Sequence, residues 1–103
     1  MKFLTDITEE HIETIRTCMN DVQNEYAPDR FLQLRVNSIS QTLSENPSLY
    51  QFTSEDLDII CMCMHDALEL LDTVKSELEP GDLLECQRFS EEVGDILALL
   101  QKQ

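Results

Sequence analysis

Apolar residues recur at steps of three and four along nearly the whole chain, and this spacing restricts it to helices. On a helix each residue advances by 100°, so positions three and four apart share a face. Breaks are few, since the 103 residues include three prolines and two glycines. Pro28, Pro47 and the Pro80-Gly81 pair therefore divide the chain into four helical segments, and none shows the alternation of a strand.

The first segment is predicted to be a helix over about residues 8–26. Asp6 or Thr8 suits its N-cap, and Glu9 and Glu10 are favourable in a first turn. Its apolar stripe comprises Ile12, Ile15, Cys18, Met19, Val22 and Tyr26.

The second segment, about 29–45, carries a narrower stripe. Phe31 and Leu34 lie off that stripe, so we expect this helix to contact neighbours on more than one side. Residues 46–52 read as a loop that should fold back onto the core. The stripe consists of Leu32, Val36, Ile39 and Leu43, and the returning loop residues are Leu49, Tyr50 and Phe52.

The third segment, about 54–78, has the widest apolar arc. Thr53 with Asp56 fits a capping box at its start, and Ser54 is an equally suitable cap. An arc of about 200° indicates a central helix or one that meets a second chain. Its stripe comprises Leu57, Ile60, Cys61, Met64, Ala67, Leu68, Leu71, Val74 and Leu78, widened by Ile59, Cys63 and Leu70.

The fourth segment, about 83–101, follows a tight turn. Asp82 with Glu85 fits a capping box. Gly94 lies in mid-helix, where it costs about 1 kcal/mol relative to alanine. A close approach of another backbone is one possible compensation. The apolar stripe comprises Phe89, Val93, Ile96, Leu97 and Leu100.

Together the segments predict an all-α fold: a compact antiparallel bundle of four amphipathic helices with a long C-terminal helical hairpin. Leucine, isoleucine, valine and phenylalanine supply 30 of the 103 residues, well above the level at which a charged chain is expected to be disordered. The length suits one domain over residues 1–103.

The charge of the chain excludes several functions. With 21 acidic against 7 basic residues the net charge is −14, which disfavours direct binding to nucleic acid or to an anionic membrane. No apolar run reaches the length of a spanning helix, and an acid at position 6 argues against a secretory signal. We therefore expect a cytoplasmic protein whose four cysteines are reduced thiols.

The acids concentrate in the C-terminal half, since residues 53–103 carry thirteen of them against three bases. A net charge of −14 exceeds what solubility requires. We expect a non-enzymatic binding protein that inhibits or regulates a basic protein, which can itself act on nucleic acid, through acidic faces of the last two helices. The expected contact residues are Asp58, Glu69, Asp72, Glu91, Glu92 and Asp95.

Two alternatives remain open. Cys61 and His65 are four residues apart and could share a soft metal ion, which predicts a ligand-binding or metal-sensing bundle. A closed site needs four ligands, so we expect no cofactor unless another helix or chain contributes. The broad third stripe could instead pair two copies in a structural homo-oligomer, in the simplest case a homodimer.

Catalysis is not expected from this sequence. His11 and Cys18 share a helix edge, but two turns separate them by about 10 Å, too far for a nucleophile and its base. The scarce arginines are expected to pair with internal carboxylates, although the neutral second segment could also be a less charged docking surface. These arginines are Arg16, Arg30, Arg35 and Arg88.

Overall fold

The computed structural model describes residues 7–101 and confirms an all-α helical bundle. Those residues contain four α-helices, two short 3₁₀ helices and no strand. In chain order the elements are α1 (Glu9–Val22), η2 (Gln23–Tyr26), α2 (Arg30–Glu45), α3 (Ser54–Val74), η3 (Lys75–Glu77) and α4 (Pro80–Gln101).

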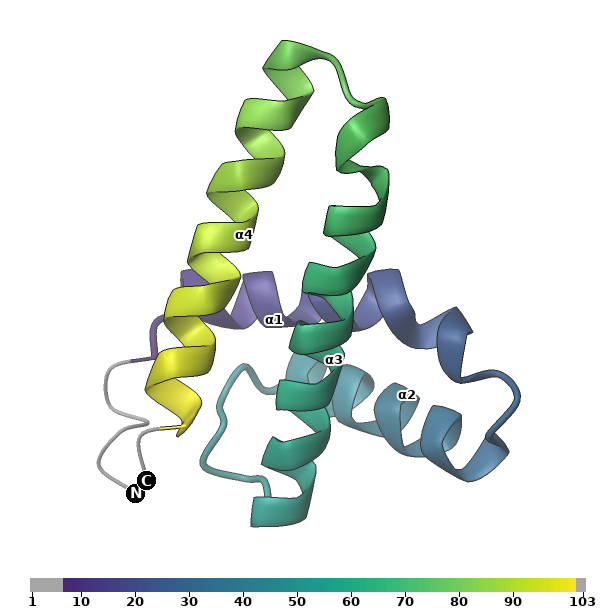
Figure 1. Ribbon diagram of the computed structural model, residues 1–103. Coiled ribbons are helices and arrows are strands. Elements are labelled where there is room, and N and C mark those ends of the chain that lie inside the picture. The colour runs from purple at the N-terminus through teal and green to yellow at the C-terminus, as the bar shows by residue number, and fades with distance from the viewer. Residues whose placement is uncertain (1–6, 102–103) are drawn as a thin grey trace.

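The two longest helices form the expected antiparallel hairpin. α3 and α4 run side by side and are joined through η3, while α1 runs across them (Figure 1). α1 and α3 each contact all three other α-helices, so the wide apolar arc of α3 does belong to a central helix. The bundle is thus a hairpin crossed by α1, rather than four helices along one axis.

Three of the helix starts have a local chemical cause. Thr8 caps α1 in a capping box: its hydroxyl accepts the His11 backbone N–H, and His11 Nδ1 accepts the Thr8 backbone N–H. The other candidate cap, Asp6, lies outside the described residues. Asp29 caps α2 by accepting the Leu32 N–H. At α3 the predicted capping box of Thr53 with Asp56 is confirmed.

The start of α4 corrects a prediction. The helix begins at Pro80, and the Glu79 carbonyl accepts the first helical hydrogen bond from the Leu83 N–H at 2.8 Å. Asp82 therefore lies inside the first turn and is not the cap. The cause is the proline, because its fixed φ and missing N–H suit the first helical position. The Pro-Gly pair starts this helix instead of forming a separate turn.

The core lies where α1 and α2 meet the hairpin. Its fully enclosed side chains come from all four helices, with Leu49 and Phe52 closing it from the loop. This confirms the stripes of the first two helices and of α4 in most positions. The largest side chains with almost no exposure are Ile15, Met19, Leu43, Ile60, Met64, Ile96 and Leu100.

Three apolar side chains are exposed against expectation. Phe31 is 83% exposed and Leu34 64%, so α2 packs on one side only, through Val36, Ile39 and Leu43. In the loop, Tyr50 is 57% exposed while Leu49 and Phe52 are buried. The prediction that α2 has neighbours on several sides is therefore wrong for this single chain, and so is the burial of Tyr50.

Gly94 needs no close contact to explain it. A Cβ built at this position meets nothing within 4 Å, and the residue is exposed. The suggested compensation by a close backbone approach is therefore wrong.

Replacing Gly94 with alanine is expected to raise the free energy of unfolding by about 1 kcal/mol, because alanine loses less backbone entropy in a helix. The melting temperature should rise by about 4–8 °C in a domain of this size. Thermal unfolding followed by circular dichroism measures the change. The matched control is Ala98→Gly at an exposed position of the same helix, which should lower stability by a similar amount. A Gly94→Ala protein no more stable than the parent would contradict this account.

Candidate protein-binding groove on the helical hairpin

The outer end of the α3–α4 hairpin projects beyond the core. The buried residues of α3 end at Ala67, and along residues 68–92 only Cys86 is buried. Figure 1 shows this end extending past α1 towards the turn at η3. Apolar residues there, such as Leu68 and Leu71, remain half-buried although they continue the stripe of the core.

The direction of α1 explains this exposure. α3 has 21 residues and spans about 32 Å, whereas a helix that crosses it covers only about 10–12 Å of that length. Because α1 lies across the hairpin rather than along it, it covers only part of the apolar stripe of α3. The uncovered part lies on the two facing helices of the projecting end.

A groove of about 490 Å³ lies between α3 and α4 at this end. Leu68, Leu71 and Cys86 supply its apolar surface, and three carboxylates and one lysine supply its charges. We call it the hairpin groove. Its lining residues are Leu68, Glu69, Leu71, Asp72, Lys75, Cys86, Gln87, Ser90 and Glu91.

The groove brings together half of the predicted contact residues. Glu69 and Asp72 come from α3 and Glu91 from α4, and all three are exposed. Asp58 and Asp95 are also exposed but do not line the groove. The six predicted residues therefore do not form one surface.

Glu92 departs from the expected outer face of α4. Its carboxylate accepts a hydrogen bond of 2.6 Å from the Thr14 hydroxyl, which also donates to the Glu10 carbonyl of its own helix. This contact joins α4 to α1, and the Glu92 side chain is only partly exposed. Glu92 thus has a structural partner in this chain.

Asp66, another acid of α3, also has a partner within the chain. It accepts a hydrogen bond from the hydroxyl of Tyr26, which is buried against α3. Burial is the main cause that raises the pKa of this phenol, and the hydrogen bond to Asp66 adds to it. The hydrogen bond to Asp66 therefore links η2 to α3, and Asp66 is not available as a free surface charge.

Sequence reasoning missed the other groove residues. Leu68 and Leu71 were expected in the core, and Lys75, Gln87 and Ser90 were not singled out. One available signal was the length of the apolar stripe of α3, since a helix that crosses it covers only about 10–12 Å of it. The crossing direction of α1, which decides what stays uncovered, comes from tertiary packing.

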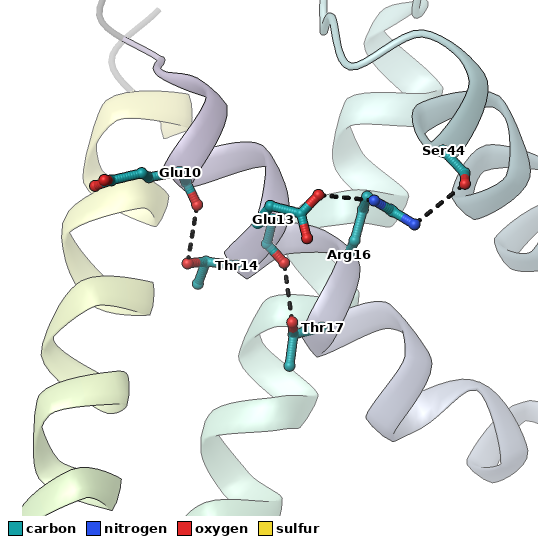
Figure 2. A network of polar contacts seen from close by, with 6 residues as sticks. All are labelled: Glu10, Glu13, Thr14, Arg16, Thr17 and Ser44. Carbon is teal, nitrogen blue, oxygen red and sulfur yellow. Dashed lines mark hydrogen bonds and ion pairs between the residues drawn. The ribbon is translucent and has the colours of Figure 1, made fainter.

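Two of the four arginines are paired, as expected. Arg16 contacts Glu13 at 2.7 Å and donates to the Ser44 hydroxyl at 3.1 Å, which links α1 to α2 (Figure 2). Arg35 contacts Asp56 at 2.9 Å. Partial burial raises the pKa of Asp56, but hydrogen bonds from Arg35 and Thr53 outweigh it and leave that pKa lowered.

Arg30 and Arg88 are exposed, and neither has an ion pair with another residue of the described range 7–101. Neither lines the hairpin groove, where Lys75 supplies the only positive charge. The carboxylates of the groove therefore outnumber its cations by three to one. This excess favours a positively charged ligand.

The Cys61 and His65 pair gains no further ligand. Across residues 7–101, no group of three or more histidine, cysteine, aspartate or glutamate side chains is placed to hold a metal ion. Cys61 is half-buried, and burial raises the pKa of its thiol. A ring nitrogen of His65 lies 3.3 Å from the amide nitrogen of Gln101.

The His11 and Cys18 pair has no nucleophilic geometry. His11 is held in the cap of α1, where its Nδ1 accepts the Thr8 N–H at 3.1 Å. Cys18 is fully enclosed, and burial raises the pKa of its thiol to about 12. A thiol with such a pKa supplies almost no thiolate at neutral pH.

Comparisons of the chain with protein-family models, with curated proteins and with solved structures find no match. Within residues 7–101, no helix is both long enough and apolar enough to cross a membrane.

Proposed function

We propose that this chain is a non-enzymatic acidic binding protein that inhibits or regulates a basic protein partner through its C-terminal hairpin. The observation that carries the proposal is the meeting of Glu69, Asp72 and Glu91 around one groove. These carboxylates line the same groove as the partly exposed Leu68 and Leu71, so the site offers both charge attraction and apolar area to bury. Both are typical of protein interfaces.

The net charge of −14 supports a role in partner selection. A surface of one sign attracts partners of the opposite sign over about a Debye length and disfavours acidic ones. The basic partner can itself act on nucleic acid, in which case these carboxylates take the place of phosphates.

Neutralising the three groove carboxylates tests the proposal. The triple variant Glu69→Gln, Asp72→Asn and Glu91→Gln is expected to weaken binding to the partner by about 3- to 150-fold at low salt, since each exposed ion pair contributes about 0.2–1 kcal/mol. The partner is first isolated from nuclease-treated lysate of the native source, with the unaltered chain as bait. Its affinity for both proteins is then measured by calorimetry.

The matched control removes the same number of charges elsewhere. Asp58, Asp95 and Glu45 are exposed and lie outside the groove. The variant Asp58→Asn, Asp95→Asn and Glu45→Gln should lose much less affinity. Equal losses in the two triple variants would show a general charge effect, and no loss in the groove variant would reject the proposed surface.

A further inference from the structure

We infer that the ligand of the hairpin groove is an amphipathic basic helix of the partner, rather than an extended basic tail. The inference rests on the proposed function and specifies its partner. It derives from the arrangement of apolar and acidic residues in the groove and from the way this chain already packs a helix on the same pair.

The acids of the groove lie on both of its helices. Glu69 and Asp72 are three residues apart on α3 and therefore neighbours on one helix face. Glu91 belongs to α4. A ligand that lies between α3 and α4 thus meets carboxylates from both sides. Lysine or arginine side chains on both flanks of the ligand complement them.

The apolar surface belongs to the same groove as these carboxylates. Leu68 and Leu71 are three residues apart on α3, and Cys86 faces them from α4. Apolar ligand side chains one helical turn apart match this spacing, with the basic residues beside them. An extended tail alternates its side chains between two opposite sides, so basic residues next to its apolar ones point away from the groove instead of towards the carboxylates on its flanks.

On another side of the hairpin, where Glu92 bonds to Thr14, this chain already packs a helix against the same pair. α1 contacts both α3 and α4 nearer the core, where it buries its own apolar stripe. Side chains of two adjacent helices form ridges and grooves that accept a third helix about 8–10 Å away. At the projecting end, no segment within residues 7–101 covers Leu68 and Leu71 fully.

Lys75 favours one orientation of a helix bound in the groove. It lines the end of the groove nearest η3, whereas Glu69 lies nearly two turns earlier on α3. A bound helix is therefore favoured when its basic residues lie near Glu69, Asp72 and Glu91, and when a neutral or acidic residue faces Lys75.

Two peptides of identical composition distinguish the helix from the tail. Both contain 14 residues of lysine and leucine; one places leucine at the helical spacing of three and four, and the other alternates leucine with lysine, which is the pattern of an extended chain with one apolar side. Binding is measured by fluorescence anisotropy and calorimetry at about 0.1 M salt. The first peptide should bind at least 10-fold more tightly, with a negative heat-capacity change because apolar surface is buried.

Leu71→Ser tests the apolar surface, with Leu84→Ser as its control. Leu84 is 60% exposed on α4 and lies outside the groove. Leu71→Ser should lower the affinity for the amphipathic peptide by about 3- to 10-fold, and Leu84→Ser should leave this affinity unchanged. The heat-capacity measurement uses the unaltered protein, so the inference stays testable if Leu71→Ser unfolds.

The outcomes separate this inference from the proposed function. If the two peptides bind with equal affinity and the groove triple variant binds neither, the result supports the acidic groove as a binding surface and rejects a helical ligand. If the unaltered protein binds neither peptide, the helical ligand is also rejected, and the salt-dependent binding of the isolated partner then decides the proposed function separately. A preference for the amphipathic peptide that Leu71→Ser abolishes supports the helical ligand.

Discussion

Replacing Ile15 with alanine is expected to lower the free energy of unfolding by about 2–5 kcal/mol. Ile15 has no exposed surface and lies in the middle of α1, which contacts the three other α-helices. The truncation removes buried apolar atoms and leaves a cavity that close packing cannot readily fill. Small domains have a total stability of only about 5–15 kcal/mol, so the loss is large. Urea unfolding followed by circular dichroism measures it.

Phe31→Ala is the matched control for this substitution. It removes a larger side chain, but Phe31 is 83% exposed on the outer side of α2. Its effect on stability should stay within about 0.5 kcal/mol. If Phe31→Ala cost as much as Ile15→Ala, Phe31 would have to be buried, and the one-sided packing of α2 would be wrong.

Stability is also expected to fall steeply above pH 9. Burial raises the pKa of Cys18 to about 12 and that of Cys63 to about 11, from about 9 in the unfolded chain. Burial also raises the pKa of Tyr26, which contacts Cys63.

The sign follows from proton binding. Because the folded state retains these protons above pH 9 and the unfolded state releases them, the stabilisation is complete below pH 9 and is lost as pH rises towards 11–12. Each such thiol lowers the free energy of unfolding by up to about 1.4 kcal/mol per pH unit in this window.

Urea unfolding under reducing conditions between pH 8 and about 10.5 tests this dependence. The double variant Cys18→Ala and Cys63→Ala has lower stability at pH 8, because it loses two buried sulfur atoms, but a flatter pH profile. The slope therefore separates titration from packing. A double variant with the same slope as the parent would show that other groups cause the alkaline loss.

Local sequence signals predicted the helices well. Thr8 and Thr53 cap α1 and α3 because their hydroxyls reach backbone N–H groups a few residues away, which needs no tertiary contact. Asp82 shows the limit of such signals. The sequence contains two overlapping helix starts, a capping box at Asp82 and a proline at position 80, and α4 begins at Pro80. Phe31 and Tyr50 show another limit. Both have large apolar side chains, yet both are exposed, because the sequence alone does not reveal whether another element packs against them.

The candidate site was only partly predictable. The sequence located the acidic hairpin, and periodicity placed Glu69 and Asp72 on one side of α3. It could not separate them from Asp66, whose partner Tyr26 lies 40 residues away, or from Glu92, whose partner Thr14 lies 78 residues away. Such pairs depend on how the helices cross.

The sequence by itself determined the helical class, most helix limits, the buried stripes and the negative charge of the hairpin. These properties follow from caps and from a period of 3.6 residues, which act within a few turns of one helix. Only the tertiary structure decided that α1 crosses the hairpin and leaves the end with Leu68 and Leu71 uncovered. Helix crossing depends on the packing of side chains from distant segments, and that packing brings Glu69, Asp72 and Glu91 into one groove.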